Sequence, residues 1–362
     1  MRITNLTIRH LVENDGSGNG SGRKRLEADF LEVQTDIGVS GLYGPIRGHV
    51  ASIAVTELRQ HIIDSNPLKH EVIWHDLYRM HPHGHTGYYV MALSAVDCAL
   101  WDLHGKILGI PVYELLGGPS RRAVPCYASM IGFDPDSVES LDLALTTRDQ
   151  GFIGQKWPLR DGPEDGYHGL LRNIRRVERL RETLGYDYPL MLDAFGRWNR
   201  HYTIEFARHI HQLNVTWLEE PLPPALGSSL TSLRRACGVP LAAGEHLYTR
   251  YEAHNLLRTE AIDYLQPDVG WCGGISEAGK IAAIASVWGI PLVPHGAGLI
   301  PALHLAAVHP PTLIPSVEYH MTLADERLFF FSERLAPIDG MIPLPTGPGL
   351  GFTVDLKPAM TT

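Results

Sequence analysis

Hydrophobic and polar positions change their pattern along the chain at about residue 120. Beyond it, short runs rich in Val, Ile and Leu are separated by longer amphipathic stretches, which is typical of βα units repeated around a parallel sheet. Eight strands are predicted, at Val124–Met130, Phe152–Trp157, Tyr188–Asp193, Val215–Glu219, Val239–Glu245, Ile262–Pro267, Ile290–His295 and Ile314–Glu318. Helices are expected between them, at Asp165–Leu184, Thr203–Leu213 and Ser276–Val287, with Ser276 as an N-cap. Eight parallel strands joined by helices can close into a barrel.

The first 120 residues have a different pattern of hydrophobic and polar positions. Leu31–Thr35 alternates like a half-exposed antiparallel strand, and Met91–Leu108 has the period of a helix that ends near Gly109. We therefore expect an α+β domain over residues 1–120 and a barrel over 121–325. Residues 326–362 are too few to fold alone, so this tail should pack back against the first domain. Residues 14–25 are glycine-rich and should form a loop, for which a neutral surface insertion and a lid over an active site are equally good explanations.

Composition narrows the class of protein. The 362 residues are 44% hydrophobic and 20% charged, which is typical of a globular protein. A net charge of −9, without a run of Lys and Arg interleaved with aromatic residues, argues against nucleic acid as a partner. The N-terminus has no signal-peptide pattern and no apolar run reaches bilayer length, so we expect a cytoplasmic protein without membrane contact. The four cysteines form no CxxC pair and are expected to be buried packing residues.

Acidic residues end three consecutive predicted strands. Asp193, Glu219 and Glu245 follow one another at intervals of 26 residues, the length of one βα unit. They should therefore lie side by side at the barrel mouth, where active sites of such barrels lie. Each alone could cap the following helix, but three together would repel one another unless a cation neutralised them. Oxygen ligands favour Mg²⁺, and Mn²⁺ would be tolerated.

The pattern of polar strand ends continues after Glu245. Asp268, His295 and Glu318 follow the next three strands, at intervals of 23, 27 and 23 residues. A carboxylate beside an imidazole fixes its tautomer and raises its basicity, so His295 is the preferred general base. A histidine at a strand end is more often structural, but the neighbouring aspartate and metal site favour catalysis. Lys156 ends strand two, where it could face a bound carboxylate or form a surface salt bridge.

Motifs spread over most of the chain resemble the enolase superfamily, within its mandelate racemase-like branch. They are Ser94–Asp97, Ala99–Asp102, Leu115–Gly118, Met191–Asp193, Trp217–Pro221, Gly244–His246, Gln266–Asp268 and Val293–Gly296. The resemblance implies a (β/α)7β TIM-type barrel with an α+β capping domain made from the N-terminal region and the C-terminal tail. It also implies Asp193, Glu219 and Glu245 as magnesium ligands, Asp268 and His295 as a dyad, and Glu318 as a hydrogen-bonding electrophile.

Two stretches, 151–166 and 266–274, are similar to the rhamnonate dehydratases of this branch. Where racemases and cycloisomerases of the branch carry a Lys-x-Lys pair, this chain has Lys156-Trp157-Pro158, so the second lysine base is absent. A racemase needs a proton acceptor on each face of the substrate carbon, whereas a syn elimination can use one histidine first as base and then as acid. The resemblance therefore implies a hydro-lyase that converts a sugar acid, a rhamnonate-like aldonate or an aldarate, to a 2-keto-3-deoxy acid.

In this interpretation the substrate carboxylate binds the metal near Lys156, and His295 takes the α-proton. Mg²⁺ and Glu318 then stabilise the ene-diolate. His246 is expected either to contact the leaving or a neighbouring hydroxyl, or to support the ligand beside it. Two alternatives are an epimerase, racemase or lactone cycloisomerase on the same site, and a sugar-acid-binding relative without catalysis. We expect a small-molecule sugar acid as the partner and a homo-oligomeric assembly.

Overall fold

The computed structural model describes residues 1–12, 26–224, 227–333 and 335–354. The glycine-rich stretch at 14–25, expected to be a lid or a surface insertion, lies outside these residues. No helix in the described ranges has the length and apolar character needed to cross a membrane. All four cysteines are buried and free, which confirms their prediction as packing residues.

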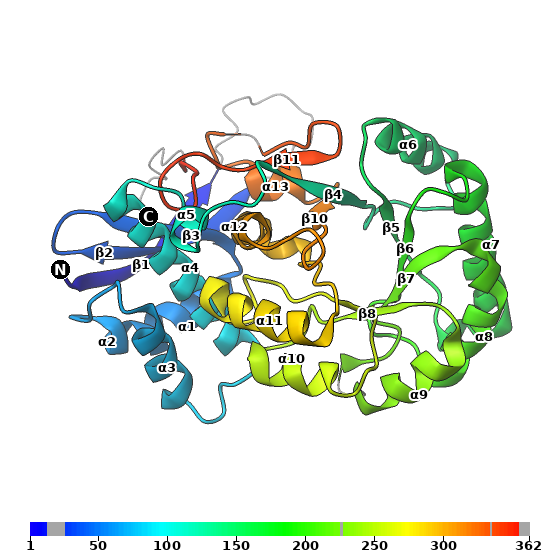
Figure 1. The fold of residues 1–362 in the computed structure, drawn as a ribbon, viewed down its shortest axis with the longest axis horizontal. Coiled ribbons are helices and arrows are strands. Elements are labelled where there is room, and N and C mark those ends of the chain that lie inside the picture. Colours follow the sequence, from blue (N-terminus) through cyan, green and yellow to red (C-terminus); the bar gives the residue numbers. More distant parts are fainter. Residues whose placement is uncertain (13–25, 225–226, 334, 355–362) are drawn as a thin grey trace.

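The N-terminal region forms a cap of one sheet and several helices, at the left of Figure 1. Its three antiparallel strands, in the order β1-β2-β3, are β1 (Ile3–Val12), β2 (Glu27–Thr35) and β3 (Ser40–Ile46). Five α-helices follow, namely α1 (Gly48–Ile53), α2 (Arg59–Ile62), α3 (His70–Met80), α4 (Tyr88–Leu108) and α5 (Val112–Leu115), with a π-helical segment, Ala54–Leu58, between the first two. Helix α4 ends at Gly109, whose left-handed φ of 70° closes the helix in the way that favours glycine.

Parallel strands form the second region, at the right of Figure 1, with helices around them. The strands pair in the order β10-β4-β5-β6-β7-β8-β9. Their bounds are β4 (Ala123–Ser129), β5 (Gln155–Pro158), β6 (Leu190–Asp193), β7 (Val215–Glu219), β8 (Leu241–Ala243), β9 (Tyr264–Leu265) and β10 (Val317–His320). The helices are α6 (Val138–Asp149), α7 (Gly166–Leu184), α8 (Arg200–Ile210), α9 (Gly227–Cys237), α10 (Thr249–Leu257), α11 (Gly274–Trp288), α12 (Leu299–Val308) and α13 (Ala324–Leu328). The curled parallel sheet with its antiparallel cap confirms the predicted fold class.

The predicted seventh strand is reduced to a single parallel bridge, between Leu265 and Leu292. Pro291 and Pro294 lie within the predicted strand and cannot donate a ladder hydrogen bond, which explains its shortness. The segment still runs beside β9, because the amide of Val293 donates to the carbonyl of Leu265 at 2.8 Å. His295 therefore lies at the same edge of the sheet as the acidic strand ends.

The prediction of Ser276 as an N-cap is wrong. Helix α11 begins at Gly274 and its N-cap is Gly273, a glycine with φ of 119°. Ser276 instead lies within the first turn, and its hydroxyl donates to Asp97 Oδ1 at 2.6 Å. The Ser276 side chain thus joins cap helix α4 to the barrel. Local sequence cannot reveal this contact, because its two residues are 179 positions apart.

One layer of buried side chains fills the barrel interior next to the acidic strand ends. Tyr127, Met191, Trp217, Ala242 and Val293 form one buried cluster contributed by different strands and by the segment after β9. Because side chains alternate between the two faces of a strand, residues two positions further along point the same way. The side chains of Ser129, Asp193 and Glu219 therefore lie above this packed layer.

The C-terminal tail contacts both regions. Strand β11 (Met341–Pro343) pairs antiparallel with β4 of the barrel, and the carbonyl of Gly349 accepts from the amide of Val112 in α5 at 2.8 Å. Figure 1 shows this segment, in red, running along the top from the barrel to the cap. The exact domain limits at residues 120 and 325 stay a prediction.

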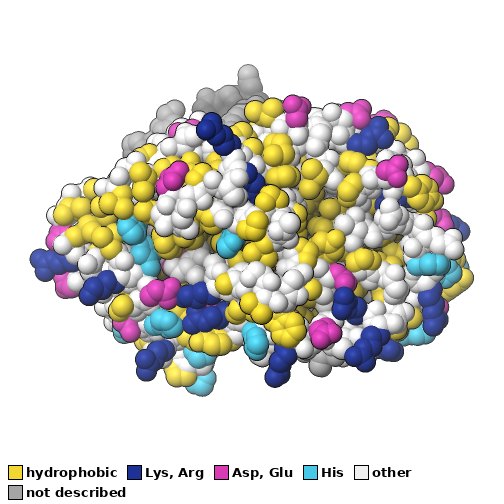
Figure 2. Space-filling model, viewed as in Figure 1, with side chains coloured by type: hydrophobic (Ala, Val, Ile, Leu, Met, Phe, Trp, Pro, Cys, Tyr) yellow, Lys and Arg dark blue, Asp and Glu magenta, His cyan; other side chains and the backbone are white. Residues whose placement is uncertain are grey.

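On the face of the molecule drawn in Figure 2, the described Lys and Arg side chains are interspersed with Asp and Glu rather than gathered into one basic patch. Such a mixed surface offers no concentrated field for an anionic polymer. The expected absence of a nucleic-acid partner stays a prediction.

Candidate active site

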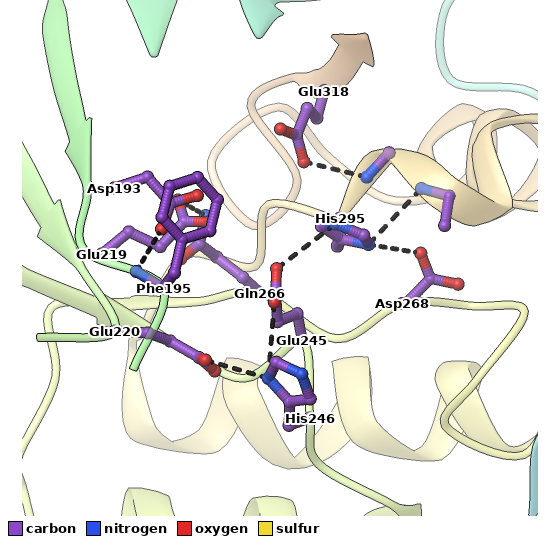
Figure 3. Close-up of polar contacts among 12 residues, drawn as sticks. Asp193, Phe195, Glu219, Glu220, Glu245, His246, Gln266, Asp268, His295 and Glu318 are labelled. Carbon is purple, nitrogen blue, oxygen red and sulfur yellow. Dashed lines mark hydrogen bonds and ion pairs between the residues drawn. The ribbon is translucent and has the colours of Figure 1, made fainter. Parts of the chain in front are cut away.

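Three carboxylates lie at neighbouring strand ends, where the sequence spacing predicts them. Asp193 ends β6 and Glu219 ends β7, and the two residues are register partners. Glu245 follows β8 after Gly244, whose φ of 135° suits glycine. Asp193 and Glu219 are 3% and 2% exposed, and the Glu245 side chain is 17% exposed. Figure 3 shows all three around one opening of the barrel.

Lys156 on β5 is completely buried among carboxylates. Its ammonium lies 2.5 Å from Glu219 Oε1, 2.8 Å from Glu318 Oε1 and 3.4 Å from Asp193 Oδ2. Burial opposes the charge of this lysine, but Glu219 and its neighbours outweigh that effect and hold the lysine pKa well above its usual value. The alternative of a surface salt bridge is therefore wrong, because no part of the side chain reaches solvent.

His295 and Asp268 form the predicted dyad. Asp268 Oδ2 lies 2.7 Å from His295 Nδ1, and Glu245 Oε2 lies 3.2 Å from the opposite nitrogen, Nε2. Figure 3 shows the two carboxylates at opposite ends of the imidazole ring. The amides of Gly270 and Gly298 donate to Asp268 at 2.8 and 3.0 Å and hold it in place. Burial lowers the pKa of His295, but Glu245 and Asp268 outweigh it and raise that pKa to about 9.

Glu318 lies on β10, the last parallel strand of the barrel along the chain. Its Oε2 accepts from the amide of Gly296 at 2.9 Å, and its Oε1 faces Lys156. Burial raises the pKa of Glu318, but Lys156 outweighs this and holds the pKa well below its usual value. The residue is therefore a carboxylate clamped between one cation and one amide.

Two side chains support Glu219 that the sequence analysis did not identify. Gln266 Nε2 and Trp217 Nε1 donate to Glu219 Oε2 at 2.7 and 3.0 Å. Trp217 precedes Glu219 by two residues on β7, so the period of a strand alone places both on the same face. Gln266 comes from the region after β9, and its contact depends on the closure of the sheet.

His246 is held by two glutamates. Its Nδ1 lies 2.9 Å from Glu220 Oε2 and 3.4 Å from Glu245 Oε1. Hydrogen bonding to Glu220 raises the pKa of His246. The histidine side chain is 42% exposed, so both expected roles, a contact with substrate and support of a ligand, stay predictions. The sequence analysis did not identify Glu220, whose positive φ of 36° turns the chain at the end of β7.

The carboxylate set fits a hard divalent cation in its chemistry. Burial raises the pKa of Asp193 to about 6 and that of Glu219 to about 7, and Glu245 and Glu318 add to the rise at Asp193. Burial also raises the pKa of Glu245. A divalent cation would relieve this repulsion with oxygen ligands alone.

The described residues also contain two tight groups of metal-type donors. They are Glu220, Glu245 and His246, and separately His295, Glu318 and His320, each with ligand atoms within 4.8 Å of one another. The predicted trio is not among them, because Asp193 and Glu219 face Lys156 while Glu245 faces His295 and His246.

Two cavities large enough for a small molecule adjoin the site, and both also touch the cap. One of about 480 Å³ is lined by Glu220, Gly244 and His246 together with Thr86 of the cap. Another of about 340 Å³ is lined by Trp271 and Ala297 of the barrel, with Tyr43 and Arg47 of the cap. Both volumes are in the range of small-molecule sites.

Acidic strand ends, a buried lysine on the second strand and a His–Asp dyad, all under an α+β cap, define a barrel of the enolase type. The chain belongs to the enolase superfamily, in its mandelate racemase and muconate lactonizing enzyme branch. Residues 140–358 match the family described as enolase C-terminal domain-like, and residues 23–117 match the N-terminal domain of mandelate racemase and muconate lactonizing enzyme. This confirms the resemblance found in the motifs.

Individual relatives agree with this membership. An L-rhamnonate dehydratase from Saccharopolyspora erythraea is 34% identical over 333 residues, which cover 90% of this chain and 82% of the relative. The structure of a rhamnonate dehydratase from Gibberella zeae complexed with Mg has a TM-score of 0.85 at 28% identity and covers 98% of this chain and 94% of its own. A 3,6-anhydro-D-galactonate cycloisomerase from Zobellia galactanivorans has a TM-score of 0.84 at 26% identity, covering 98% and 97%.

Proposed function

We propose that this protein is a magnesium-dependent sugar-acid dehydratase, a hydro-lyase that forms a 2-keto-3-deoxy acid. One observation carries the proposal: the dyad of His295 and Asp268 faces the carboxylate mouth, while Pro158 stands where a second lysine base would be needed. Such a site can remove a proton and return it on one face of the substrate. The names of the relatives from S. erythraea and G. zeae support dehydration as the reaction.

Asp193, Glu219 and Glu245 would hold the metal, and the magnesium in the G. zeae structure supports this choice of ion. When bound, the ion would supply positive charge that stabilises negative charge developing on the substrate carboxylate. Lys156 and Glu318 border the same space. Lys156 offers a buried positive charge to the substrate carboxylate. Glu318, fixed by Gly296, would have to carry a proton to donate a hydrogen bond to a carboxylate oxygen as the ene-diolate forms.

His295 performs both proton transfers in this proposal. Asp268 holds Nδ1, which leaves Nε2, the nitrogen on the Glu245 side, to take the α-proton. The electron pair of the broken C–H bond first forms the ene-diolate, as a double bond between the α-carbon and the carboxylate carbon. When the carboxylate re-forms, that pair becomes the double bond between the α- and β-carbons, and the β-hydroxyl leaves with the proton returned by His295. Water is released, and the resulting enol becomes the 2-keto acid. Because the same imidazole gives and takes the proton, no second catalytic base is required.

The substrate class is an aldonate or aldarate, with an L-rhamnonate-like acid as the first candidate because of the relative at 34% identity. The half-exposed His246 beside Glu245 is placed to contact a hydroxyl of such an acid. A cycloisomerase also occurs among the structural relatives, so the reaction type needs its own test.

A panel of mono- and diacid sugars, incubated with enzyme and Mg²⁺, tests the proposal. We expect at least one acid to yield a keto product that reacts with semicarbazide. A parallel incubation in D₂O separates the reactions, because deuterium at the α-carbon of recovered acid without loss of water indicates an epimerase. An isomeric product from a lactone or anhydro acid indicates a cycloisomerase. Binding of acids without product or exchange would show a binding protein and refute the proposal.

A further inference from the structure

Four side chains on the first and last barrel strands have buried polar atoms without a hydrogen-bond partner among the described residues. They are Tyr127 and Ser129 on β4, and Glu318 and His320 on β10. The atom of Glu318, Oε1, is ion-paired with Lys156, whereas both ring nitrogens of His320 lack a partner. Strands β4 and β10 pair in parallel, with His320 opposite Ser129 and Glu318 opposite Tyr127. Register partners share a face, and Tyr127 belongs to the interior cluster. All of these side chains therefore point into the barrel.

His320 lies at the centre of the candidate site. Its ring centroid is 5.4 Å from that of His295, and its Nε2 is 3.7 Å from Glu318 Oε1, beyond hydrogen-bond distance. The residue is only 5% exposed. Gly296, which follows the proposed base, is what makes room for it, because a Cβ at position 296 would overlap the His320 ring. The His320 ring can therefore take this position only because residue 296, next to His295, has no side chain.

The chemistry of this histidine suits a hydroxyl group. Burial lowers the pKa of His320 to about 3, so the ring is neutral and offers one N–H donor and one acceptor nitrogen. A hydroxyl likewise donates and accepts, whereas a carboxylate only accepts. The Ser129 hydroxyl, opposite in register, adds a second group of the same kind.

The described part of the chain does not satisfy these atoms by itself, and a buried polar atom without a partner is destabilising. Apolar side chains would fill the same space at lower cost. Water is one alternative partner, because His320 also lines a small cavity of about 30 Å³ with Tyr43 and Arg327, large enough to hold a water molecule. A hydroxyl group of a ligand is the other alternative partner. Only this second alternative predicts that activity on a hydroxylated substrate depends on His320.

We propose that His320, together with Ser129, binds a hydroxyl of the substrate's carbon chain and selects among sugar acids by its configuration. This inference rests on the proposed function, in which the substrate lies between His295 and Glu318. Both groups are fixed on adjacent strands, so a hydroxyl of the opposite configuration would leave them buried and unpaired. Loss of such a contact penalises the wrong substrate more strongly than a misfit in an apolar pocket.

The test compares His320→Leu with His320→Gln, which keeps a donor and an acceptor. Values of kcat and KM are measured for the best acid of the panel and for deoxy analogues that each lack one chain hydroxyl. We expect His320→Leu to lower kcat/KM at least tenfold on the full acid and less than threefold on one analogue, with part of the loss recovered in His320→Gln. His70→Leu, which replaces a buried histidine of cap helix α3, controls for removal of a buried imidazole and should change kcat/KM less than twofold.

The inference is overturned if folded His320→Leu keeps kcat/KM within twofold, or loses the same factor on the full acid and on every analogue, as a water-bound histidine would. Should His320→Leu fail to fold, Ser129→Ala and His320→Gln provide the same comparison. If the wild type dehydrates no acid, calorimetry with the acid panel replaces kinetics. Binding weakened at least tenfold by His320→Leu then supports the subsite although the proposed function has failed. Equal binding, or no binding by the wild type, refutes the subsite.

Discussion

Two sets of buried carboxylates in this protein have opposite surroundings. At the joint that the cap forms with the barrel and the C-terminal tail, Asp102 of α4 accepts the amides of Leu42 in the cap and Leu350 in the tail at 2.7 and 2.8 Å, and it pairs with Lys106 at 2.6 Å. At the barrel mouth, Asp193 accepts one amide, from Phe195, and otherwise faces a shared lysine and other carboxylates. The fold by itself satisfies the first set and leaves the second in electrostatic conflict. Carboxylates of the first kind hold structure together, and those of the second kind are the ones that we propose bind a metal ion.

The largest expected effect is at the dyad. His295→Asn removes the only proposed base while keeping a polar side chain of similar bulk, so kcat should fall about 10³-fold. Magnesium binding, measured by calorimetry, should remain, because the imidazole is not a proposed metal ligand. Activity within tenfold of the wild type would show that His295 is not the base. It would also refute the view that the carboxylates around His295 form an active site.

The next effect is at the joint. Asp102→Ala leaves two backbone amides and Lys106 without their shared acceptor, so the free energy of unfolding should fall by about 3 kcal/mol. Activity per folded molecule should stay within twofold of the wild type. Denaturant unfolding and steady-state kinetics measure the two quantities. The exposed Asp149→Ala is a control that should change stability by less than about 0.5 kcal/mol, and an equally small loss in Asp102→Ala would contradict the structural role.

Magnesium should stabilise one set of carboxylates and not the other. At a concentration 100-fold above its Kd, an ion that binds only the folded protein adds about 2.7 kcal/mol to the free energy of unfolding. Asp193→Asn should lose most of this gain, since it removes a proposed ligand. Asp97→Asn at the joint should keep it. Thermal unfolding with and without Mg²⁺ decides the matter, and an equal gain in both variants would refute the metal assignment.

The smallest effect concerns pH and a histidine of the joint. Burial lowers the pKa of His304 to about 4, and its ring links the amide of Tyr113 to the carbonyl of Leu350. As the pH falls from 6.5 toward 4, the unfolded chain takes up the proton first, so stability is lost in that window. Between pH 6.5 and 5 the loss from this residue should be about 1.6 kcal/mol.

His304→Gln isolates this contribution from those of the other buried histidines, which both proteins share. Urea unfolding at pH 6.5 and 5 should show a smaller acid loss in the variant than in the wild type. Identical losses would mean that His304 does not titrate with folding.

Much of the fold could be predicted from sequence because the apolar runs and their spacing follow the period of a βα unit. Strand bounds were predicted less well where prolines intervene, as at Pro291 and Pro294, since one missing N–H shortens a ladder. The predicted site residues all lie in the barrel mouth, because each one ends a strand or follows it closely. His320 was overlooked although it follows Glu318 by two residues, and the period of a strand was a sufficient signal.

The sequence by itself determined that Asp193, Glu219 and Glu245 meet at one edge, since equal spacing between parallel strands leaves their ends side by side. Only the tertiary structure decided which charges pair: Lys156 with Asp193, Glu219 and Glu318, and His295 between Glu245 and Asp268. The same is true of Asp102, whose amide partners are 60 and 248 residues away. The physical reason is that periodicity acts between near neighbours, whereas electrostatic pairing depends on distances of a few ångströms set only when the barrel closes under its cap.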